Sequence, residues 1–281
     1  MPNAIITGGG SGIGRAFCEQ LAREGYEVAV VDRNLMAAEE TVALIAVRSG
    51  KSFAVAADVS QLDDWRRLHD TLRSRWSRLD LLVNNAGILL GGELIACDLD
   101  ACRKLIDVNL FGVLAGCHTF TPWLIESHHK STECSGIINI GSIFGVISPP
   151  AFASYSAAKA GVISLSEALR AELGPHGLTV TVAIPGATPT QLFATGQYAS
   201  PELATAVKRY LPHTEITAQQ VAAQTLASFR GGKLYAPIGR RSKLFWRLKR
   251  YWPIWTLRLV ARKTLETLGG GANASKSNKR E

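Results

Sequence analysis

The chain has 281 residues, of which 47% are hydrophobic and 19% are charged, so it can bury a large core and disorder is expected only at its end. No run reaches the roughly 18 uninterrupted apolar residues of a membrane-spanning helix, and the first residues lack a secretory signal, which predicts a cytoplasmic protein. The five cysteines are odd in number and never form Cys-x-x-Cys, which indicates neither disulfides nor a zinc site, and no metal is expected.

The net charge of +8 is unevenly divided along the chain. Residues 240–281 contain 12 Lys and Arg against 2 Asp and Glu, a net charge of +10. Residues 1–239 contain the remaining 19 against 21, a net charge of −2. Any anionic partner that the total charge implies is therefore a partner of the C-terminal segment.

Short apolar runs rich in β-branched residues alternate with helical stretches through residues 1–239. This alternation predicts an α/β fold in which a doubly wound, Rossmann-like parallel sheet of about seven strands carries helices on both faces. A ligand lies beyond the carboxyl ends of the strands in such a sheet, so the residues after each strand are candidates for a site. We expect strands at residues 4–7, 27–31, 53–57, 79–84, 136–140, 178–184 and 233–237.

A glycine-rich turn, TGGGSGIG at residues 7–14, ends the first expected strand and runs directly into a helix. Glycines let the backbone approach a bulky anion, whose charge the free N–H groups at the helix N-terminus stabilise. The spacing differs from Gly-x-Gly-x-x-Gly, but Asp32 follows the next strand, 20 residues past Gly12, as in dinucleotide-binding proteins. The residues predicted to contact the phosphates are Gly8, Ser11, Gly12, Ile13 and Gly14.

Asp32 bears on which dinucleotide is bound. A carboxylate at this position accepts hydrogen bonds from the adenosine ribose hydroxyls and repels a 2′-phosphate, which favours NAD over NADP. The adjacent Arg33 could stack on adenine or bind a 2′-phosphate, or it could be a solvated surface charge. We predict NAD as the cofactor, with NADP as the weaker alternative.

The stretch SYSAAKAG at residues 154–161 places Tyr155 one helical turn before Lys159 among small residues. At this i, i+4 spacing the phenol and the ammonium lie above one another. Ketone reduction needs a proton donor that becomes an anion, and the ammonium, together with the positive nicotinamide of NAD⁺, should lower the pKa of the phenol. A buried tyrosine beside a surface lysine is the alternative interpretation.

Together these motifs resemble those of the short-chain dehydrogenase/reductase family, over roughly residues 2–240. Further matching motifs follow in the family's order along the chain. They are Asp58-Val59 after the third expected strand, NNAG at 84–87, Asn109 in the next helix, Ser142, 13 residues before Tyr155, and IPGATPT at 184–190.

The resemblance implies an oxidoreductase, active as a homodimer or homotetramer, that transfers a hydride between NAD(H) and an alcohol or ketone. It implies Tyr155 as general acid/base and Ser142 as the group that holds the substrate oxygen. It also implies that Lys159 binds the nicotinamide ribose and that Asn109 holds a water for a proton relay. The other implied cofactor contacts are Asp58, Val59, Asn85, Ala86, Gly87, Pro185, Gly186, Thr188 and Thr190.

A non-catalytic NAD-binding sensor or scaffold on the same fold is the alternative function, because fold alone does not imply activity. The presence of all four polar side chains, Asn109, Ser142, Tyr155 and Lys159, argues against it. One departure from the family pattern is Thr188, where the family usually has Ile or Val. The usual contacts there come from the backbone, so we expect cofactor binding to survive.

Residues 191–214 stand where the family places its variable substrate lid. Apolar residues there and at 87–94 favour a lipophilic alcohol or ketone as substrate, although a lid also needs apolar residues to pack. The apolar lid residues are Leu192, Phe193, Tyr198, Leu203, Val207 and Leu211.

Beyond Gly239 the family pattern stops, and residues 240–268 form a basic, aromatic extension with a narrow apolar face and a second helix from Pro253. Residues 241–268 could bind an anionic membrane surface, making the protein peripheral at the inner face of a membrane, or could dock on the body or another subunit. Nucleic acid is not expected, because no recognised binding signature is present. Residues 269–281 are predicted to be a disordered tail. The predicted apolar face is Leu244, Phe245, Leu248, Tyr251 and Trp252.

Overall fold

The computed structural model of the chain describes residues 1–46, 51–128, 134–210 and 216–277. Its centre is a sheet of seven strands that all pair in parallel, as the sequence predicts, with strand ends within two residues of the predicted ones. Across the sheet the strands are β3 (Phe53–Ala56), β2 (Glu27–Asp32), β1 (Asn3–Thr7), β4 (Leu81–Asn84), β6 (Gly136–Ile140), β7 (Thr179–Pro185) and β9 (Tyr235–Ile238).

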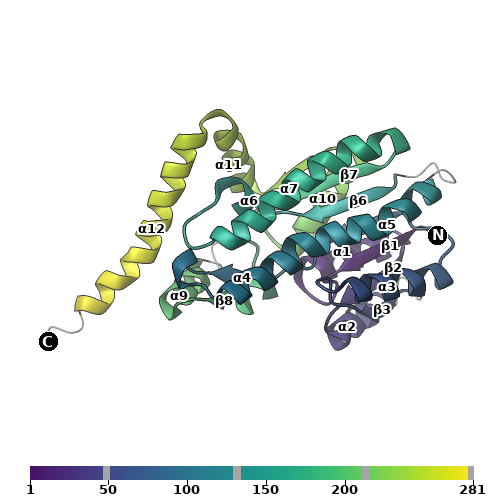
Figure 1. Cartoon of the computed structure of the whole chain (residues 1–281), viewed down its shortest axis with the longest axis horizontal. Helices are drawn as coiled ribbons and strands as arrows, with labels where there is room; N and C mark the ends of the chain where they lie inside the picture. Colours follow the sequence, from purple (N-terminus) through teal and green to yellow (C-terminus); the bar gives the residue numbers. More distant parts are fainter. Residues whose placement is uncertain (47–50, 129–133, 211–215, 278–281) are drawn as a thin grey trace.

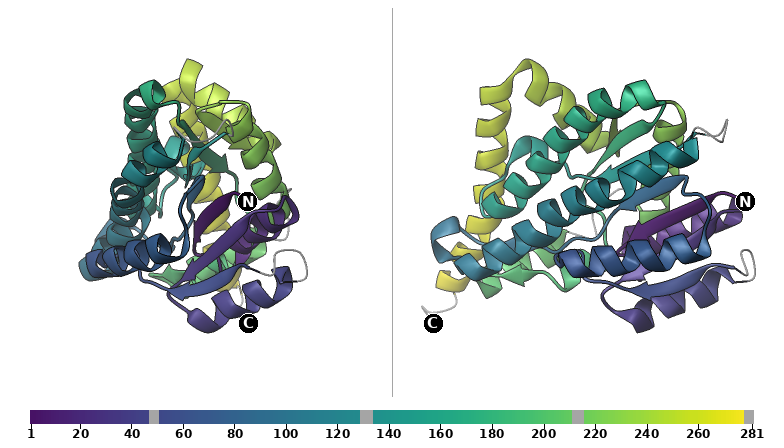
Figure 2. Two further views of the ribbon diagram at one scale, coloured as in Figure 1. Left: turned by 90° about the vertical axis from the view of Figure 1, so that its right-hand side faces the viewer. Right: turned by 45° about the vertical axis from the view of Figure 1, so that its right-hand side comes forward.

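Helices cover both faces of the sheet (Figures 1 and 2). Because successive strand side chains point to opposite faces, Ile5 joins one core cluster, and its neighbours Ala4 and Ile6 join the other. Both faces bury apolar residues, as expected of a parallel sheet. The first cluster includes α3 (Leu62–Arg75), α5 (Gly112–His128) and α7 (Ala153–Leu173), and the second includes α1 (Gly12–Arg23), α2 (Leu35–Ile45) and α10 (Ala218–Arg230).

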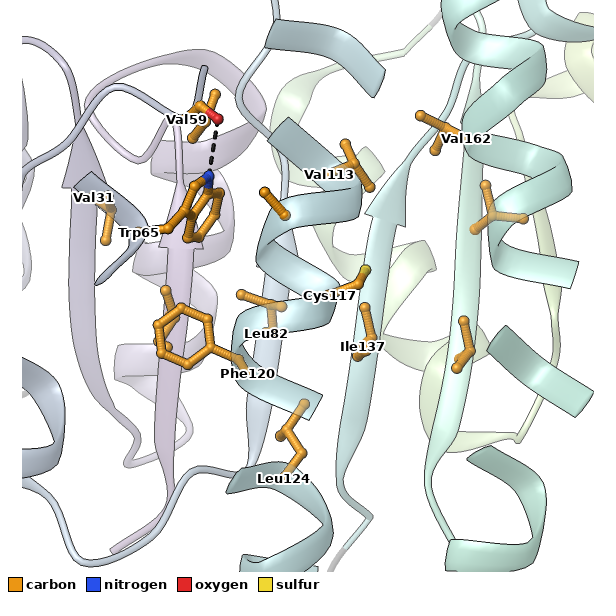
Figure 3. Packing of buried hydrophobic residues seen from close by; sticks show 14 of the residues in the cluster. Val31, Val59, Trp65, Leu82, Val113, Cys117, Phe120, Leu124, Ile137 and Val162 are labelled. Carbon is orange, nitrogen blue, oxygen red and sulfur yellow. Dashed lines mark hydrogen bonds between the residues drawn. The ribbon is translucent and has the colours of Figure 1, made fainter. Parts of the chain in front are cut away.

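Trp65 of α3 connects this core to the loop after β3 (Figure 3). Its indole Nε1 donates a 2.9 Å hydrogen bond to the carbonyl of Val59, and its ring meets Phe120 of α5 edge to face at 6.1 Å. The indole is therefore both packed and satisfied, as a buried tryptophan requires. This contact fixes the loop that carries Asp58 and Val59.

The chain between β4 and α5 contains several short elements. They are β5 (Leu90–Gly91), a 3₁₀ helix (Leu94–Ala96), α4 (Leu99–Ile106) and a π-helical turn (Asp107–Phe111). Within the described residues, the run Leu99–His128 is the one helix whose length and composition would allow it to cross a membrane, and 56% of its most apolar window is buried. It passes this test as the core helix of a soluble protein does, so it is weak support for a membrane span.

The predicted lid folds as α8 (Gln191–Ala194), β8 (Gln197–Tyr198) and α9 (Pro201–Tyr210). Strand β8 pairs with β5, a small second sheet that the sequence does not predict. This pairing ties the lid to the segment after β4, because Gln197 N donates to Leu89 O and Ala199 N to Gly91 O. Leu211 and the rest of the lid to residue 214 lie outside the described residues. The remaining short helices are α6 (Phe144–Ile147) and the 3₁₀ helix Gly174–His176.

The extension forms two helices, α11 (Arg240–Tyr251) and α12 (Pro253–Ser277), and the second begins at Pro253 as predicted. Helix α12 extends to Ser277, and the disordered tail predicted for residues 269–281 stays a prediction. In Figure 1 α12 leaves the body at α11, and it contacts α9 and α6.

The apolar face predicted for α11 differs from the face that docks on the body. Leu244, Tyr251 and Trp252 are exposed, whereas Ser242 is buried and Phe245 and Trp246 pack against the core. Residues 242, 245 and 246 have the i, i+3, i+4 spacing of one helical face. The Trp246 ring lies 4.7 Å from that of Tyr235 in β9. Docking on the body and an exposed apolar surface therefore coexist in one helix.

Candidate active site

A cavity of about 680 Å³ opens at the carboxyl ends of the parallel strands. The loops after β1, β2, β3, β4, β6 and β7 all contribute to it, because the carboxyl ends of parallel strands meet at one edge of a sheet. Of the predicted site residues, all but Gly14 and Asn109 line this cavity. Those that do are Gly8, Ser11, Gly12, Ile13, Asp32, Arg33, Asp58, Val59, Asn85, Ala86, Gly87, Ser142, Tyr155, Lys159, Pro185, Gly186, Thr188 and Thr190.

The glycine-rich turn has the backbone that its sequence predicts. Gly8 and Gly12 have φ values of 63° and 52°, which disfavour residues with a side chain. Ser11, the N-cap of α1, makes no side-chain capping hydrogen bond, so the first N–H groups of the helix remain available to an anion. Gly14 has a packing role, since a Cβ there would lie 2.0 Å from Gly8 O.

Thr7 connects the first and fourth strand ends, a function that the sequence analysis missed. Its Oγ1 accepts hydrogen bonds from the backbone N–H groups of Asn85 and Ala86 at 3.0 and 3.1 Å. The Asn85 amide in turn donates to the carbonyls of Thr7 and Gly8. The Asn85 side chain therefore joins two loops of the cavity, in addition to lining it.

Asp32 is held at the cavity edge by two backbone donors. Its Oδ2 accepts from Gly10 N and its Oδ1 from Asn34 N, both at 3.0 Å. The neighbouring Arg33 is exposed. Burial of Asp58 raises its pKa, but hydrogen bonds from Ser60, followed by the charge of Arg33, outweigh this and lower the pKa overall. The Asp32 carboxylate is thus fixed at the edge of the cavity, with the chemistry to accept hydrogen bonds from an adenosine ribose.

Tyr155 and Lys159 lie on the cavity side of α7, and both are buried. Lys159 Nζ donates a 2.8 Å hydrogen bond to Ile140 O and lies 5.9 Å from the centre of the Tyr155 ring. A surface lysine, the alternative interpretation, is therefore wrong. Ser142 Oγ accepts from Phe144 N at 3.1 Å, which fixes its hydroxyl at the end of β6 beside Tyr155.

Burial shifts both titrating groups toward their neutral forms. It raises the pKa of Tyr155 to about 12, although the Ser142 hydroxyl acts in the opposite direction, and it lowers the pKa of Lys159 to about 8. The lowered tyrosine pKa expected from the sequence is not found in the protein alone, because desolvation dominates. At neutral pH the phenol is a protonated donor, which suits the proton-delivery step of a reduction.

Asn109 lies in the π-helical turn and is fully buried. Its amide is engaged on both sides by one residue, since Oδ1 accepts from Ile88 N and Nδ2 donates to Ile88 O, each at 2.8 Å. It lies behind Gly87, where a Cβ would be 3.3 Å from Asn109 Oδ1 and 3.7 Å from Lys159 Nζ. π-Helical turns are frequent at functional sites.

A buried polar row beneath the cavity was also missed from the sequence. Asn84 Nδ2 donates to Asn139 Oδ1 at 2.9 Å, and Asn139 Nδ2 donates to Ser166 Oγ at 3.0 Å. These bonds link β4, β6 and α7, so the strand ends carrying Ser142 and Gly87 are held relative to Tyr155. Asn139 stands between Ile138 and Ile140 in an otherwise apolar strand, and only its neighbours in space identify its role.

The end of the cavity near Tyr155 is apolar. Phe144 meets the Tyr155 ring edge to face at 6.1 Å and packs on Phe152 at 5.1 Å. Leu192 and Phe193 of the lid line the cavity. The predicted lid residues Tyr198, Leu203 and Val207 belong to the core cluster behind it.

Thr188 is accommodated without an unpaired hydroxyl. Its side chain is buried, and its Oγ1 donates to Gly186 O at 3.1 Å. Within the described residues, no group of three or more His, Cys, Asp or Glu side chains could hold a metal ion.

Known proteins resemble this chain in both sequence and structure. The short chain dehydrogenase family profile matches residues 2–199. A 3-oxoacyl-acyl-carrier-protein reductase from Synechocystis sp. is 33% identical over 235 residues, which cover 79% of this chain and 93% of that protein. A 3beta-hydroxysteroid dehydrogenase 1 from Eggerthella lenta is 33% identical over 224 residues, covering 79% and 84%. A solved short chain dehydrogenase/reductase from Burkholderia phymatum in complex with NAD has a TM-score of 0.81 at 27% identity, covering 89% and 92%.

Proposed function

This chain belongs to the short-chain dehydrogenase family, and on that premise we propose that it transfers a hydride between NAD(H) and a lipophilic alcohol or ketone. The observation that carries the proposal is the joint placement of Ser142, Tyr155 and Lys159 at one end of a cavity whose other end has an uncapped helix N-terminus and Asp32. We assign this catalytic unit to residues 1–239.

Bound NADH would supply the hydride to the carbonyl carbon. Ser142 Oγ holds the carbonyl oxygen beside Tyr155, and the Tyr155 hydroxyl, protonated at neutral pH, donates its proton to that oxygen. Lys159 stabilises the resulting phenolate through its charge. Because its pKa is about 8, Lys159 can exchange protons near physiological pH and return one to the phenolate.

Asn109 acts as a positioning residue in this scheme. Ile88 engages both polar atoms of its side chain, so a relay water at this place would be held by the backbone of the π-helical turn. The amide instead fixes the Gly87–Ile88 segment against Lys159. This contact holds the part of the cavity wall beside the Lys159 ammonium in a fixed position.

NAD is the preferred cofactor in this proposal. Asp32 is fixed by Gly10 and Asn34, where its charge accepts ribose hydrogen bonds and opposes a 2′-phosphate. Arg33 is exposed beside Asp32 at the outer edge of the cavity.

A lipophilic substrate fits the apolar end of the cavity beside Tyr155, formed in part by Phe144, Leu192 and Phe193. The two relatives are named for 3-oxoacyl and hydroxysteroid substrates. Both kinds of substrate carry a carbonyl or alcohol group on a largely apolar skeleton. We propose the same chemical class here.

An activity panel separates this function from that of a non-catalytic NAD-binding sensor or scaffold. The full chain would be assayed for NADH oxidation with 3-oxoacyl thioesters, 3-oxosteroids and aliphatic ketones, and for NAD⁺ reduction with the corresponding alcohols. We expect turnover with at least one lipophilic member. Tight NADH binding without turnover in either direction would support the sensor instead.

A further inference from the structure

The junction of α11 and α12 gathers exposed apolar side chains that the proposed reaction does not use. Tyr251, Trp252, Ile254 and Trp255 are 71%, 60%, 61% and 54% exposed, and Leu244, two turns earlier in α11, is 53% exposed. The Tyr251 and Trp252 rings lie 6.0 Å apart. We call these five residues the apolar tip. Large apolar side chains exposed together mark an interaction surface.

The apolar tip lies within a strongly cationic segment. Residues 240–265 contain nine Lys and Arg and no Asp or Glu. Eight of these nine cations are exposed, and Lys249 is half-buried. Arg247, Arg250 and Arg258 flank the tip in sequence. An acid-free segment of this kind attracts an anionic surface.

The opposite side of the extension is already buried on the body. Ser242, Thr256 and Val260 are buried, and Phe245 and Trp246 pack against the core. The tip is therefore not needed to dock the helices. Figures 1 and 2 show the α11–α12 junction at the top of the molecule, with α2 and α3 near the bottom.

We propose that the apolar tip and its flanking cations bind the surface of an anionic lipid bilayer. Tyrosine and tryptophan favour the level of the lipid headgroups, leucine and isoleucine favour the acyl boundary, and cations bind anionic headgroups. A nucleic acid would bind the cations but would leave the five apolar side chains of the tip without a role. A second copy of this chain offers little complementary charge, because residues 1–239 have a net charge of only −2.

The test measures co-sedimentation of the full chain with phosphatidylglycerol–phosphatidylcholine vesicles and with pure phosphatidylcholine vesicles. We expect binding to the anionic vesicles to be about tenfold or more tighter, because each cation near such a surface contributes about 1 kcal/mol. Added salt should weaken binding without abolishing it, since apolar burial is not screened. Quenching of tryptophan fluorescence by brominated lipid reports insertion.

Two pairs of variants separate the contributions. Trp252→Ser with Trp255→Ser should lower binding about tenfold or more by removing apolar burial, whereas the matched control, Met36→Ser with Leu44→Ser on α2, should not change it. Arg247→Glu with Arg258→Glu should weaken the preference for anionic vesicles, whereas the charge control Arg66→Glu should not. Light scattering should give the same mass for all these proteins.

Three results would overturn the proposal. The first is equal or absent binding of the full chain to both kinds of vesicle at low salt. The second is binding of a DNA duplex that exceeds vesicle binding and survives the paired tryptophan substitution. The third is a lower molecular mass of the tryptophan variant, which would identify a second copy of the chain as the occupant.

Discussion

The active-site end of α7 buries a lysine and a tyrosine, Lys159 and Tyr155 at 4% and 5% exposure, whereas the α11–α12 junction exposes Trp252 and Trp255 by more than half. The two regions therefore depart from the usual distribution of polarity in opposite directions. At the site, desolvation shifts pKa values toward neutral forms. At the junction, the apolar area stays available for a partner.

The two regions also differ in their effect on the stability of the fold. Burying an ammonium is unfavourable and is tolerated because the group is hydrogen-bonded to Ile140. Exposing a tryptophan costs little in folding free energy but leaves an apolar surface to which a partner can bind. Departures from local rules concentrate at functional sites, and the following substitutions test whether these two departures act as described.

The largest effect is expected from Tyr155→Phe. Removing the proton donor should lower turnover about 10²- to 10⁴-fold, with little effect on folding or NADH affinity. Steady-state kinetics, thermal unfolding and NADH titration measure the three properties. Tyr235→Phe is the control, because its hydroxyl donates to Glu167, 12 residues after Tyr155 in α7, and neither Tyr235 nor Glu167 lines the cavity. Wild-type turnover by Tyr155→Phe would rule the mechanism out.

Lys159→Met should uncouple stability from activity. The wild-type lysine has a pKa of about 8 when folded and about 10.4 when unfolded. The unfolded state therefore binds more protons between these values, and wild-type stability rises with pH across that window. At pH 7 the variant should be more stable by roughly 2 kcal/mol, after allowing for the lost bond to Ile140.

Denaturant unfolding at pH 7 and at pH 10 measures this effect. The stability difference between variant and wild type should shrink at the higher pH, while turnover is lost at both. Lys233→Met, at an exposed position, is the control and should leave the pH dependence unchanged. A Lys159→Met protein less stable than wild type at pH 7 would mean that the ammonium contributes net stability.

Within the extension, Trp246→Ala and Trp252→Ala should differ in stability. Trp246 packs on the core and on Tyr235, so its truncation should cost about 2 kcal/mol. Trp252 is exposed, and its truncation should change stability by less than about 0.5 kcal/mol. Chemical denaturation of both variants compares them; equal losses would show that the two faces of α11 are not distinct.

The smallest effect is expected from Asp32→Ala at the far end of the cavity. Removing the carboxylate should narrow the preference for NADH over NADPH, measured as the ratio of kcat/KM values, by about tenfold, or 1.4 kcal/mol. Arg33→Ala is the paired control and should leave NADH kinetics nearly unchanged. A wild-type preference for NADPH would show that Arg33, not Asp32, determines cofactor choice.

The parts of the fold that the sequence predicts are those encoded locally. Strands β1 and β2 contain apolar runs at residues 4–6 and 28–31. The turn from Gly8 to Gly14 needs glycine at positions with positive φ, so both features could be recognised without a structure. In contrast, the Thr7–Asn85 and Asn84–Asn139 bonds depend on which strands are neighbours. Strands β5 and β8 have two residues each, too few for a detectable pattern.

In the extension, too, the sequence alone does not tell which residues of helix α11 are buried. Hydrophobicity alone groups Leu244, Phe245, Leu248, Tyr251 and Trp252 into one apolar face, but the surface that α11 contacts decides which of them are buried. Ser242 is small enough to approach Gly186, where a Cβ would lie 3.2 Å from its Oγ. A helical wheel drawn from the sequence contains no information about the contact between Ser242 and Gly186.

Hydride transfer itself tests the central claim most directly. The full chain would be incubated with NADH deuterated at each face of C4 in turn and with the lipophilic ketones of the activity panel, and the products analysed by mass spectrometry. We predict an alcohol with one deuterium on the carbinol carbon from one of the two labelled cofactors, and none with Tyr155→Phe on the same timescale. Absence of deuterium from every product with both labelled cofactors would contradict the account.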